Sequence, residues 1–243
     1  MIRIKKEKKD KNMKFCAIRK QVYNANLELV NKDLVISTWG NVSGYDPEND
    51  VIAIKPSGIP YKQMKVEDIV ILDLEGNIVD GKCKPSTDTP THLELYRKFI
   101  PLGIYGIVHT HSKYATSWAQ SGREIPCYGT THVDYFYGNI PITRQLSSKE
   151  MENYEINTGK IILEKFTDKE MLEIPAVLVR NHGPFAWGKT PEDAVTHSQV
   201  LEFISEMAIH TEDISESPTV LPRKIADKHH LRKFGKDAYY GQE

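Results

Sequence analysis

Apolar residues follow two different spacings along the chain, and these spacings predict a mixture of helices and strands. Between Met13 and Val30 they recur at helical intervals, whereas Val51 to Ile54 is a short β-prone run. The same reasoning predicts helices over residues 13–30, 89–99, 114–120, 156–166, 190–210 and 223–233. Strands are predicted over residues 34–38, 51–54, 69–74, 78–79, 104–108, 135–142 and 176–180.

Turn and cap residues mark the ends of these elements. Thr89-Pro90 and Thr190-Pro191 each place a capping threonine before a proline at the first helical position. Neighbouring strands are often joined by loops too short for a crossover helix, which favours antiparallel pairing. We therefore expect a flexible lysine-rich leader at residues 1–13 and one α/β domain at residues 14–243, with a central antiparallel or mixed sheet flanked by helices. No Gly-x-Gly-x-x-Gly follows a strand, which argues against a Rossmann fold.

The composition narrows the class of protein. Hydrophobic residues make up 40% of the 243 residues, charged residues make up 27%, and the formal net charge is −1. This near-neutral balance gives no reason to expect nucleic acid or an anionic membrane as a partner. No apolar run approaches the roughly 20 residues of a membrane span. The lysine-rich start predicts no secretory signal, and three scattered cysteines are typical of reduced thiols in the cytoplasm.

Three histidines lie at the ends of two apolar runs. His109-Thr110-His111 closes the run 104–108, and His182 follows the run 177–179 within a sharp Asn-His-Gly-Pro turn. Alternate residues of a strand project from the same face, so His109 and His111 can grip one cation, with His182 as a third ligand. Asp88 is a candidate for a fourth ligand, although capping of the helix that follows it explains this residue equally well.

Three short polar segments have the composition of an anion-binding site. Gly40-Asn41, Ser57-Gly58 and Ser86-Thr87 offer small residues, hydroxyls or backbone N–H groups, and the last precedes a helix N-terminus. Lys55 adds a compact positive charge beside the second segment. Each segment taken singly is explained by a plain turn.

Two further features suggest proton transfer or docking. Asp134 lies in a short polar segment before an aromatic run. Its carboxylate can serve as a general acid or base, or it can belong to an ordinary surface turn. The C-terminal Tyr239-Tyr240 pair is aromatic where a tail is usually polar, which predicts docking onto this chain or a neighbouring subunit. The remaining histidines are interpreted as surface, cap or packing residues: His92, His132, His197, His210, His229 and His230.

Seven segments in the same order resemble one known family. They are TWGNVSG, IKPSG, KPSTDTPTH, GIVHTHS, GTTHVDYFYG, NHGPFAWG and KHHLRKFGKDAYYG. They look like the L-ribulose-5-phosphate 4-epimerases, within the class II aldolase/adducin-type superfamily, and the likeness covers residues 14–242. The resemblance implies an α/β/α sandwich around a largely antiparallel sheet. It also implies interconversion of L-ribulose 5-phosphate and D-xylulose 5-phosphate by breaking and re-forming the C3–C4 bond, in L-arabinose catabolism.

The resemblance also implies roles for individual residues. A divalent ion, most readily Zn²⁺ with Mn²⁺ or Co²⁺ also acceptable, is held by His109, His111, His182 and Asp88. The substrate, mostly its phosphate, is held by the polar segments beside Lys55: Gly40, Asn41, Ser57, Gly58, Ser86 and Thr87. Asp134 and Tyr240 form the acid/base pair in a homotetramer with shared active sites, where Tyr240 and Arg232 reach the adjacent protomer. Thr87 departs from the family's second serine but keeps the hydroxyl.

Two alternatives stay open, and a third is disfavoured. An aldolase of the same superfamily, such as one that cleaves L-fuculose 1-phosphate, resembles this chain but uses glutamate where Asp88 stands. An epimerase of L-ascorbate or L-xylulose catabolism would share the same motifs. A non-catalytic scaffold like the adducin head domain is disfavoured, because all three metal-type histidines are present.

Overall fold

The computed structural model describes residues 13–236, 238 and 239, and its centre is a seven-stranded sheet. The strand order is β4-β3-β2-β1-β5-β7-β6, and every neighbouring pair in these residues is antiparallel. The strands are β1 (Asn41–Asp46), β2 (Val51–Ile54), β3 (Val70–Leu72), β4 (Ile78–Asp80), β5 (Gly106–His109), β6 (Ala176–Val179) and β7 (Gly183–Gly188).

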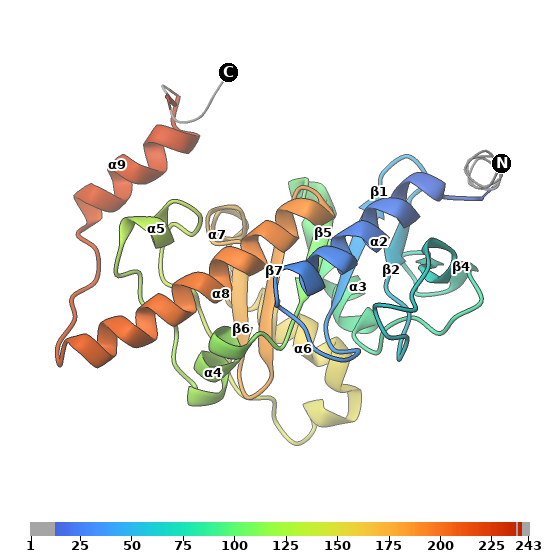
Figure 1. Ribbon diagram of the computed structural model, residues 1–243, viewed down its shortest axis with the longest axis horizontal. Helices are drawn as coiled ribbons and strands as arrows, with labels where there is room; N and C mark the ends of the chain where they lie inside the picture. The colour runs from blue at the N-terminus through green and yellow to red at the C-terminus, as the bar shows by residue number, and fades with distance from the viewer. Residues whose placement is uncertain (1–12, 237, 240–243) are drawn as a thin grey trace.

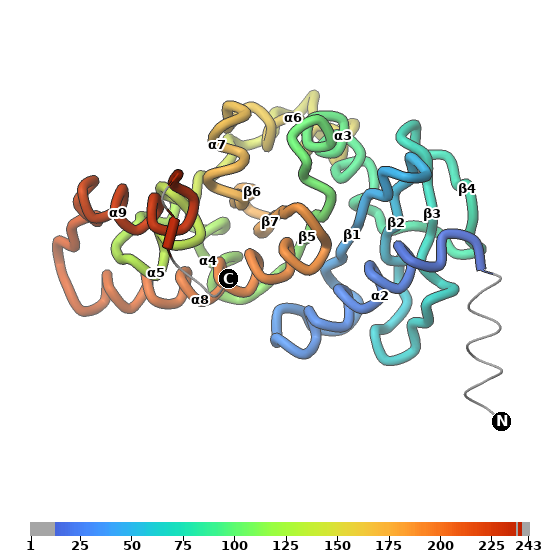
Figure 2. The backbone as a smooth tube through the Cα atoms, turned by 90° about the horizontal axis from the view of Figure 1, so that it is seen from above, coloured from blue at the N-terminus to red at the C-terminus, as the bar shows by residue number. Residues whose placement is uncertain are grey.

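Helices cover both faces of the sheet, so the expected α/β/α sandwich is confirmed (Figures 1 and 2). Figure 2 shows α2 and α8 on one side of the sheet and α3, α6 and α7 on the other, with α5 and α9 beyond the β6 end. The helices are α2 (Cys16–Asn31), α3 (Thr89–Phe99), α4 (Lys113–Ser121), α5 (Thr130–Val133), α6 (Tyr154–Leu163), α7 (Asp168–Glu173), α8 (Pro191–Ile214) and α9 (Arg223–Phe234). Short 3₁₀ turns are η1 (Val66–Asp68), η2 (Ile100–Leu102) and η3 (Glu150–Asn153).

The apolar stripe of each main helix faces the sheet. Tyr96 and Phe99 of α3 are fully buried, and the Phe99 ring lies 4.9 Å from that of Trp187 in β7. On the opposite face, Leu201 and Ile204 of α8 pack into a second cluster. Burial of each such side chain contributes about 1.5–3 kcal/mol, so the two layers hold the sheet from both sides.

Antiparallel pairing brings separate segments to one edge of the sheet. Asn41 at the start of β1 pairs with His109 at the end of β5, and His109 pairs with Phe185 near the start of β7. The end of β2, followed by Lys55, lies at the same edge because β2 is antiparallel to β1. The chain therefore delivers four distant segments to one place.

Two of the predicted strands are wrong, while the helix and strand predictions elsewhere match elements of the structure. Residues 34–38 form a turn, in which Ser37 adopts a left-handed conformation (φ 56°) and Ile36 is 66% exposed. Residues 135–142 contain only isolated bridges, through Ile140 and Ile142. Phe136 and Ile140 are instead buried in a cluster with residues of α4 and α8. In contrast, β1 and β7 were not predicted from the sequence.

Membrane insertion through a helix is not supported by the described residues. Across 13–236, 238 and 239, no helix combines the length and the apolar character needed to cross a bilayer.

One buried histidine outside the predicted metal-binding group, His132, predicts a pH-dependent stability. His132 is 4% exposed, its Nε2 donates to the Gly138 carbonyl at 2.8 Å, and burial lowers its pKa to about 4. The unfolded chain, with an ordinary histidine pKa of about 6.5, binds the proton more readily, so stability falls as pH drops from 6.5 towards 4. We expect His132 to account for a loss of about 2 kcal/mol between pH 7 and pH 5.

Urea unfolding of the parent and of His132→Gln at both pH values measures this contribution. The glutamine can still donate to Gly138 but cannot titrate, so the loss should shrink by about the stated amount. His210→Gln is the control, because His210 lies on the exposed part of α8 and has a side chain 61% exposed. An unchanged pH dependence in His132→Gln would contradict the prediction.

Candidate metal centre

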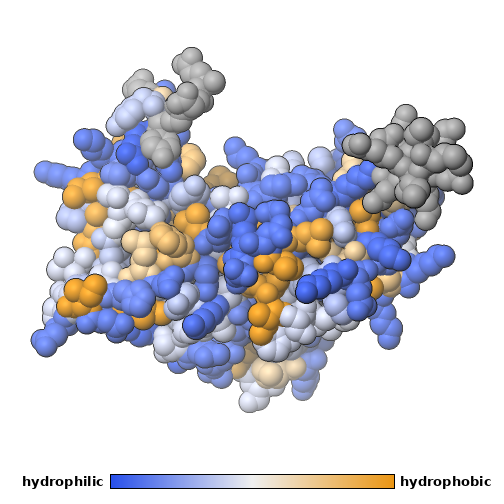
Figure 3. All heavy atoms as spheres, viewed as in Figure 1, coloured by the Kyte–Doolittle hydropathy of each residue, from blue (hydrophilic) through white to orange (hydrophobic). Residues whose placement is uncertain are grey.

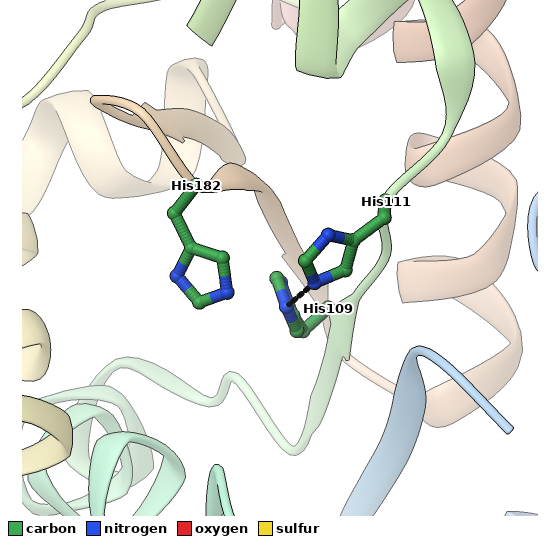
Figure 4. Close-up of side chains that lie close together, drawn as sticks. All are labelled: His109, His111 and His182. Carbon is green, nitrogen blue, oxygen red and sulfur yellow. Dashed lines mark hydrogen bonds between the residues drawn. The ribbon is translucent and has the colours of Figure 1, made fainter. Parts of the chain in front are cut away.

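The three predicted histidines converge at the sheet edge (Figure 4). One ring nitrogen from each of His109, His111 and His182 lies within 4.8 Å of the others. His109 ends β5, His111 follows two residues later, and His182 directly precedes β7. The sequence prediction that a His-x-His pair and a distant histidine meet in space agrees with this geometry.

Hydrogen bonding orients the most buried of these imidazoles. His109 is 1% exposed, and its Nδ1–H donates to the Pro184 carbonyl at 3.0 Å. Because a carbonyl only accepts, the Nε2 lone pair is left to face inward, where it lies 3.1 Å from Nε2 of His111. The His109 ring also stacks on Phe185, with 4.3 Å between ring centroids. This ring therefore has one orientation available.

The charge state of the cluster suits a cation. Burial lowers the pKa of His182 to about 3, and the neighbouring His109 lowers it further. Burial also lowers the pKa of His111. Both rings are therefore neutral at physiological pH, which is the form that binds a metal. A donor set of three imidazoles fits Zn²⁺ and neighbouring first-row ions.

A cavity of about 320 Å³ opens beside the histidines. Its size falls at the lower end of small-molecule sites. It gathers every predicted substrate-binding residue together with two of the histidines, and its lining is Thr38, Trp39, Gly40, Asn41, Lys55, Pro56, Ser57, Gly58, Ser86, Thr87, Asp88, His111 and His182.

Backbone hydrogen bonds hold two of the polar segments side by side. Ser57 N–H donates to the Lys84 carbonyl at 2.9 Å, and Ser86 N–H donates to the Lys55 carbonyl at 3.0 Å. Gly40 supplies a left-handed turn (φ 75°) in which a Cβ would come within 3.0 Å of the His109 carbonyl. A larger residue at position 40 would therefore push against the strand that carries the histidines.

Lys55 provides the positive charge of the cavity. Its side chain is 2% exposed, and Nζ donates to the Thr38 carbonyl at 3.1 Å and lies 4.7 Å from the centroid of the Tyr61 ring. Burial lowers the pKa of Lys55 to about 8, while the Asp88 carboxylate acts in the opposite direction. The ammonium is largely charged at neutral pH and sits where an anion would enter.

Asp88 lines the same cavity but stands apart from the compact histidine group. Its Oδ2 accepts from Asn41 Nδ2 at 2.7 Å, and although it occupies the N-cap position of α3, its side chain makes no cap bond. Burial pushes the pKa of Asp88 upward, but the nearby imidazoles, led by His109, and the Asn41 amide hold it below the ordinary value. The carboxylate is therefore ionised, and the helix-capping interpretation does not account for it.

Asp134 lies elsewhere, against α9. It accepts from Arg232 Nη2 at 2.7 Å and from His229 Nδ1 at 3.0 Å, and Lys233 donates to its carbonyl at 3.2 Å. Within the described part of the chain it is not among the residues that line the cavity. Tyr240, its predicted partner, lies outside the described residues. The structure thus joins Asp134 to the C-terminal helix and not to the three histidines of the same chain.

Three residues of functional interest were not predicted from the sequence. Trp39 lines the cavity and is 54% exposed, with its ring 5.9 Å from that of His111. Its position in the sequence next to Gly40-Asn41, a predicted substrate-binding segment, could have indicated that Trp39 lines the cavity. Tyr154 bonds to His182 across 28 residues of chain, and His229 bonds to Asp134 across 95, so neither contact has a local signature.

Comparison with known proteins identifies the family. The family model described as the class II aldolase and adducin N-terminal domain matches residues 20–209. The chain belongs to this family. Class II aldolases are typically dependent on a divalent metal, and the histidine group described above is able to hold such an ion. The membership indicates an enzyme that acts on sugar phosphates.

Solved structures of the class II aldolase type share the fold. An L-fuculose 1-phosphate aldolase is 26% identical with a TM-score of 0.75, over 88% of this chain and 95% of that one. The L-fuculose 1-phosphate aldolase from Glaciozyma antarctica is 17% identical with a TM-score of 0.71, over 91% and 83% of the two chains. A sugar-phosphate aldolase from Thermotoga maritima is 20% identical with a TM-score of 0.64, over 83% and 97%.

Proposed function

We propose that this protein is a metal-dependent 4-epimerase that interconverts L-ribulose 5-phosphate and D-xylulose 5-phosphate. The observation that carries the proposal is the single cavity in which the histidine group meets three anion-binding segments and Lys55. A sugar phosphate needs both the anion-binding segments and the histidine group. Its phosphate requires N–H groups and positive charge, and its hydroxyl and carbonyl oxygens require a Lewis acid. The remaining choice is between epimerase and aldolase.

Two features favour the epimerase over the aldolase. The carboxylate beside the histidines is Asp88, and the resembling aldolases carry glutamate there. Aspartate is shorter by one methylene, which suits metal ligation better than proton transfer. The segments GTTHVDYFYG and KHHLRKFGKDAYYG also resemble the epimerases, and Arg232 of the second bonds to Asp134 of the first.

The reaction is chemically simplest as carbon–carbon cleavage and re-addition. The hydrogen on C4 is not adjacent to the C2 carbonyl, so direct removal of that proton is unfavourable. A bound divalent ion, held by His109, His111 and His182 with Asp88 beside them, would supply Lewis-acid polarisation of the substrate oxygens. Breaking the C3–C4 bond releases the C4 hydroxyl proton to a base and leaves a C4 aldehyde, which turns over before the bond re-forms.

The residues of this chain would then have distinct tasks. Lys55 and the segments around Ser57 and Ser86 hold the phosphate, so that the two-carbon fragment cannot escape while its aldehyde rotates. Asp134 and Tyr240 serve opposite faces of the aldehyde, one removing the proton of the C4 hydroxyl and the other returning a proton to the C4 oxygen. Each turnover therefore leaves the proton count unchanged.

A homotetramer with shared active sites accommodates the separation between Asp134 and the histidines. In such an assembly Asp134, Arg232 and Tyr240 act on the cavity of an adjacent protomer. Figure 3 shows apolar patches interrupting the hydrophilic face that carries α2 and α8. On α8, Phe203, Met207 and Ile214 are 55%, 43% and 87% exposed, which is apolar surface that a neighbouring copy can cover.

We further place the enzyme in the cytoplasm and in L-arabinose catabolism.

Lys55 predicts how substrate binding depends on pH. Its pKa is lowered to about 8 by burial, so the ammonium loses its charge as pH rises from 7 to 9. We expect KM for the sugar phosphate to rise about tenfold across this range, because a charge-assisted bond to phosphate is lost. Initial rates as a function of substrate concentration and pH measure the effect.

Lys55→Arg is the matched variant, since a guanidinium stays charged throughout the range. Its KM should be nearly independent of pH even if its absolute value is higher. A parent enzyme whose KM is the same at pH 7 and pH 9 would contradict the assigned role.

The test of the proposed function is a product analysis with L-ribulose 5-phosphate. A coupled assay for D-xylulose 5-phosphate should show steady conversion, without accumulation of free glycolaldehyde phosphate or dihydroxyacetone. Release of the two fragments, or cleavage of L-fuculose 1-phosphate at a higher kcat/KM, would instead support the aldolase activity named for the 26% identical structure. Elemental analysis of the purified protein decides between Zn²⁺, Mn²⁺ and Co²⁺.

A further inference from the structure

The outer nitrogen of His182 contacts a tyrosine hydroxyl. Tyr154, the first residue of α6, places its Oη 3.1 Å from Nδ1 of His182, and the two ring centroids are 6.0 Å apart. The other ring nitrogen of His182 faces His109 and His111 (Figure 4). The imidazole is thus held between the phenol on one side and the histidine group on the other.

This contact is compatible with the neutral form of the imidazole that binds metal, because a tyrosine hydroxyl can accept a hydrogen bond as well as donate one. A histidine binds metal through a nitrogen that carries a lone pair, so Nε2 of His182 is available only when the proton sits on Nδ1. An Nδ1–H needs an acceptor, and the Tyr154 oxygen is within hydrogen-bond distance. His109 shows the same arrangement with a different acceptor, because its Nδ1–H donates to the Pro184 carbonyl.

We propose that Tyr154 is a positioning residue of the metal centre, whose hydroxyl accepts the Nδ1–H of His182 and so directs the Nε2 lone pair of that ring towards the bound ion. The inference rests on the histidine metal site of the proposed function, and it is independent of which sugar phosphate reacts. Outer partners of this kind orient metal-ligating histidines and raise their basicity.

The position of α6 does not depend on the Tyr154 hydroxyl. Thr91 Oγ1 of α3 donates to the Glu155 carbonyl at 2.7 Å. Gly159 packs so closely on α3 that a Cβ there would lie 2.5 Å from Cβ of Glu94. These contacts fix the helix, so Tyr154→Phe removes one oxygen and leaves the ring and the helix in place.

The experiment measures zinc affinity without catalysis. Full-length parent and Tyr154→Phe, stripped of metal, are titrated with Zn²⁺ against a competing chromophoric chelator. We expect the variant to bind Zn²⁺ about tenfold more weakly, within the range seen when such outer partners are removed. Long-range ¹H–¹⁵N spectra of the metal-free proteins, assigned with His182→Asn, should show His182 protonated on Nδ1 in the parent and shifted towards Nε2–H in the variant.

Tyr45→Phe is the matched control. It removes a tyrosine hydroxyl that donates to Asp50 at 2.8 Å, at the opposite end of β1 from the cavity. Its zinc affinity should equal that of the parent. The inference is overturned if Tyr154→Phe binds Zn²⁺ within twofold of the parent, if both variants weaken equally, or if the His182 tautomer is unchanged. A parent that binds no Zn²⁺ would overturn the metal centre itself, a separate outcome.

Discussion

His109→Asn is expected to lose its metal and on the order of 1,000-fold or more of kcat/KM, because the Lewis acid contributes several kcal/mol to transition-state stabilisation. His109 is the most buried of the three histidines and is fixed by the Pro184 carbonyl and the Phe185 ring. Asparagine is too short to reach the same point and offers a weaker donor. The rest of the cavity should keep its shape, since the backbone pairing of β5 with β1 and β7 does not involve the side chain.

Metal content by elemental analysis and steady-state kinetics should be measured on the same preparation. His210→Asn, which changes an exposed histidine of α8, is expected to retain both metal and turnover. A His109→Asn protein that lacks metal but converts L-ribulose 5-phosphate at the parental rate would remove the ion from the mechanism.

Asp134→Asn is expected to lower kcat by about 100- to 10,000-fold while metal content stays at the parental level. The amide keeps the size of the carboxylate and its contact with His229, but it cannot accept a proton. The substitution also breaks the ion pair with Arg232, so a control must separate catalysis from stability. Glu212→Gln is this control, because it also breaks an ion pair: Glu212 pairs with Arg123 at 2.6 Å on the protein surface. It should leave kcat unchanged.

Mixing the two inactive variants tests whether sites are shared between subunits. In the proposed closed ring, each site would combine the histidines of one protomer with Asp134 of its neighbour. Random assembly of His109→Asn and Asp134→Asn chains would give about a quarter of the sites two intact halves. Recovered activity of that order after co-expression is the expected result. No recovery in verified mixed oligomers would place Asp134 and the histidines in the same protomer's site, or remove Asp134 from catalysis.

The cavity was predictable because each of its segments carries its chemistry in adjacent residues. Gly40-Asn41, Ser57-Gly58 and Ser86-Thr87 are recognisable one at a time, and the sheet then brings them together. The Tyr154 contact was not predictable, since a phenol on α6 meets His182 only through the packing of α6 on α3. No pattern in the residues near Tyr154 or His182 indicates such a contact.

The errors in the fold have a similar cause. Residues 34–38 have β-prone side chains, but Ser37 turns the chain before any partner strand is reached. The opposite error was made at β7, which was not predicted because Gly183 and Pro184 are residues that disfavour a strand. Pairing with β5 on one side and β6 on the other overrides that local preference and leaves Phe185 and Trp187 fully buried.

The two inward-facing imidazoles differ in how their outer partners can change. The oxygen that orients His109 belongs to the main chain at position 184, so no substitution there deletes it. The oxygen that faces His182 belongs to the side chain of Tyr154, and a single nucleotide change can replace it. If Tyr154 has the proposed positioning role, mutation of position 154, natural or designed, would adjust the affinity of the site for a metal ion while leaving the three histidines unchanged.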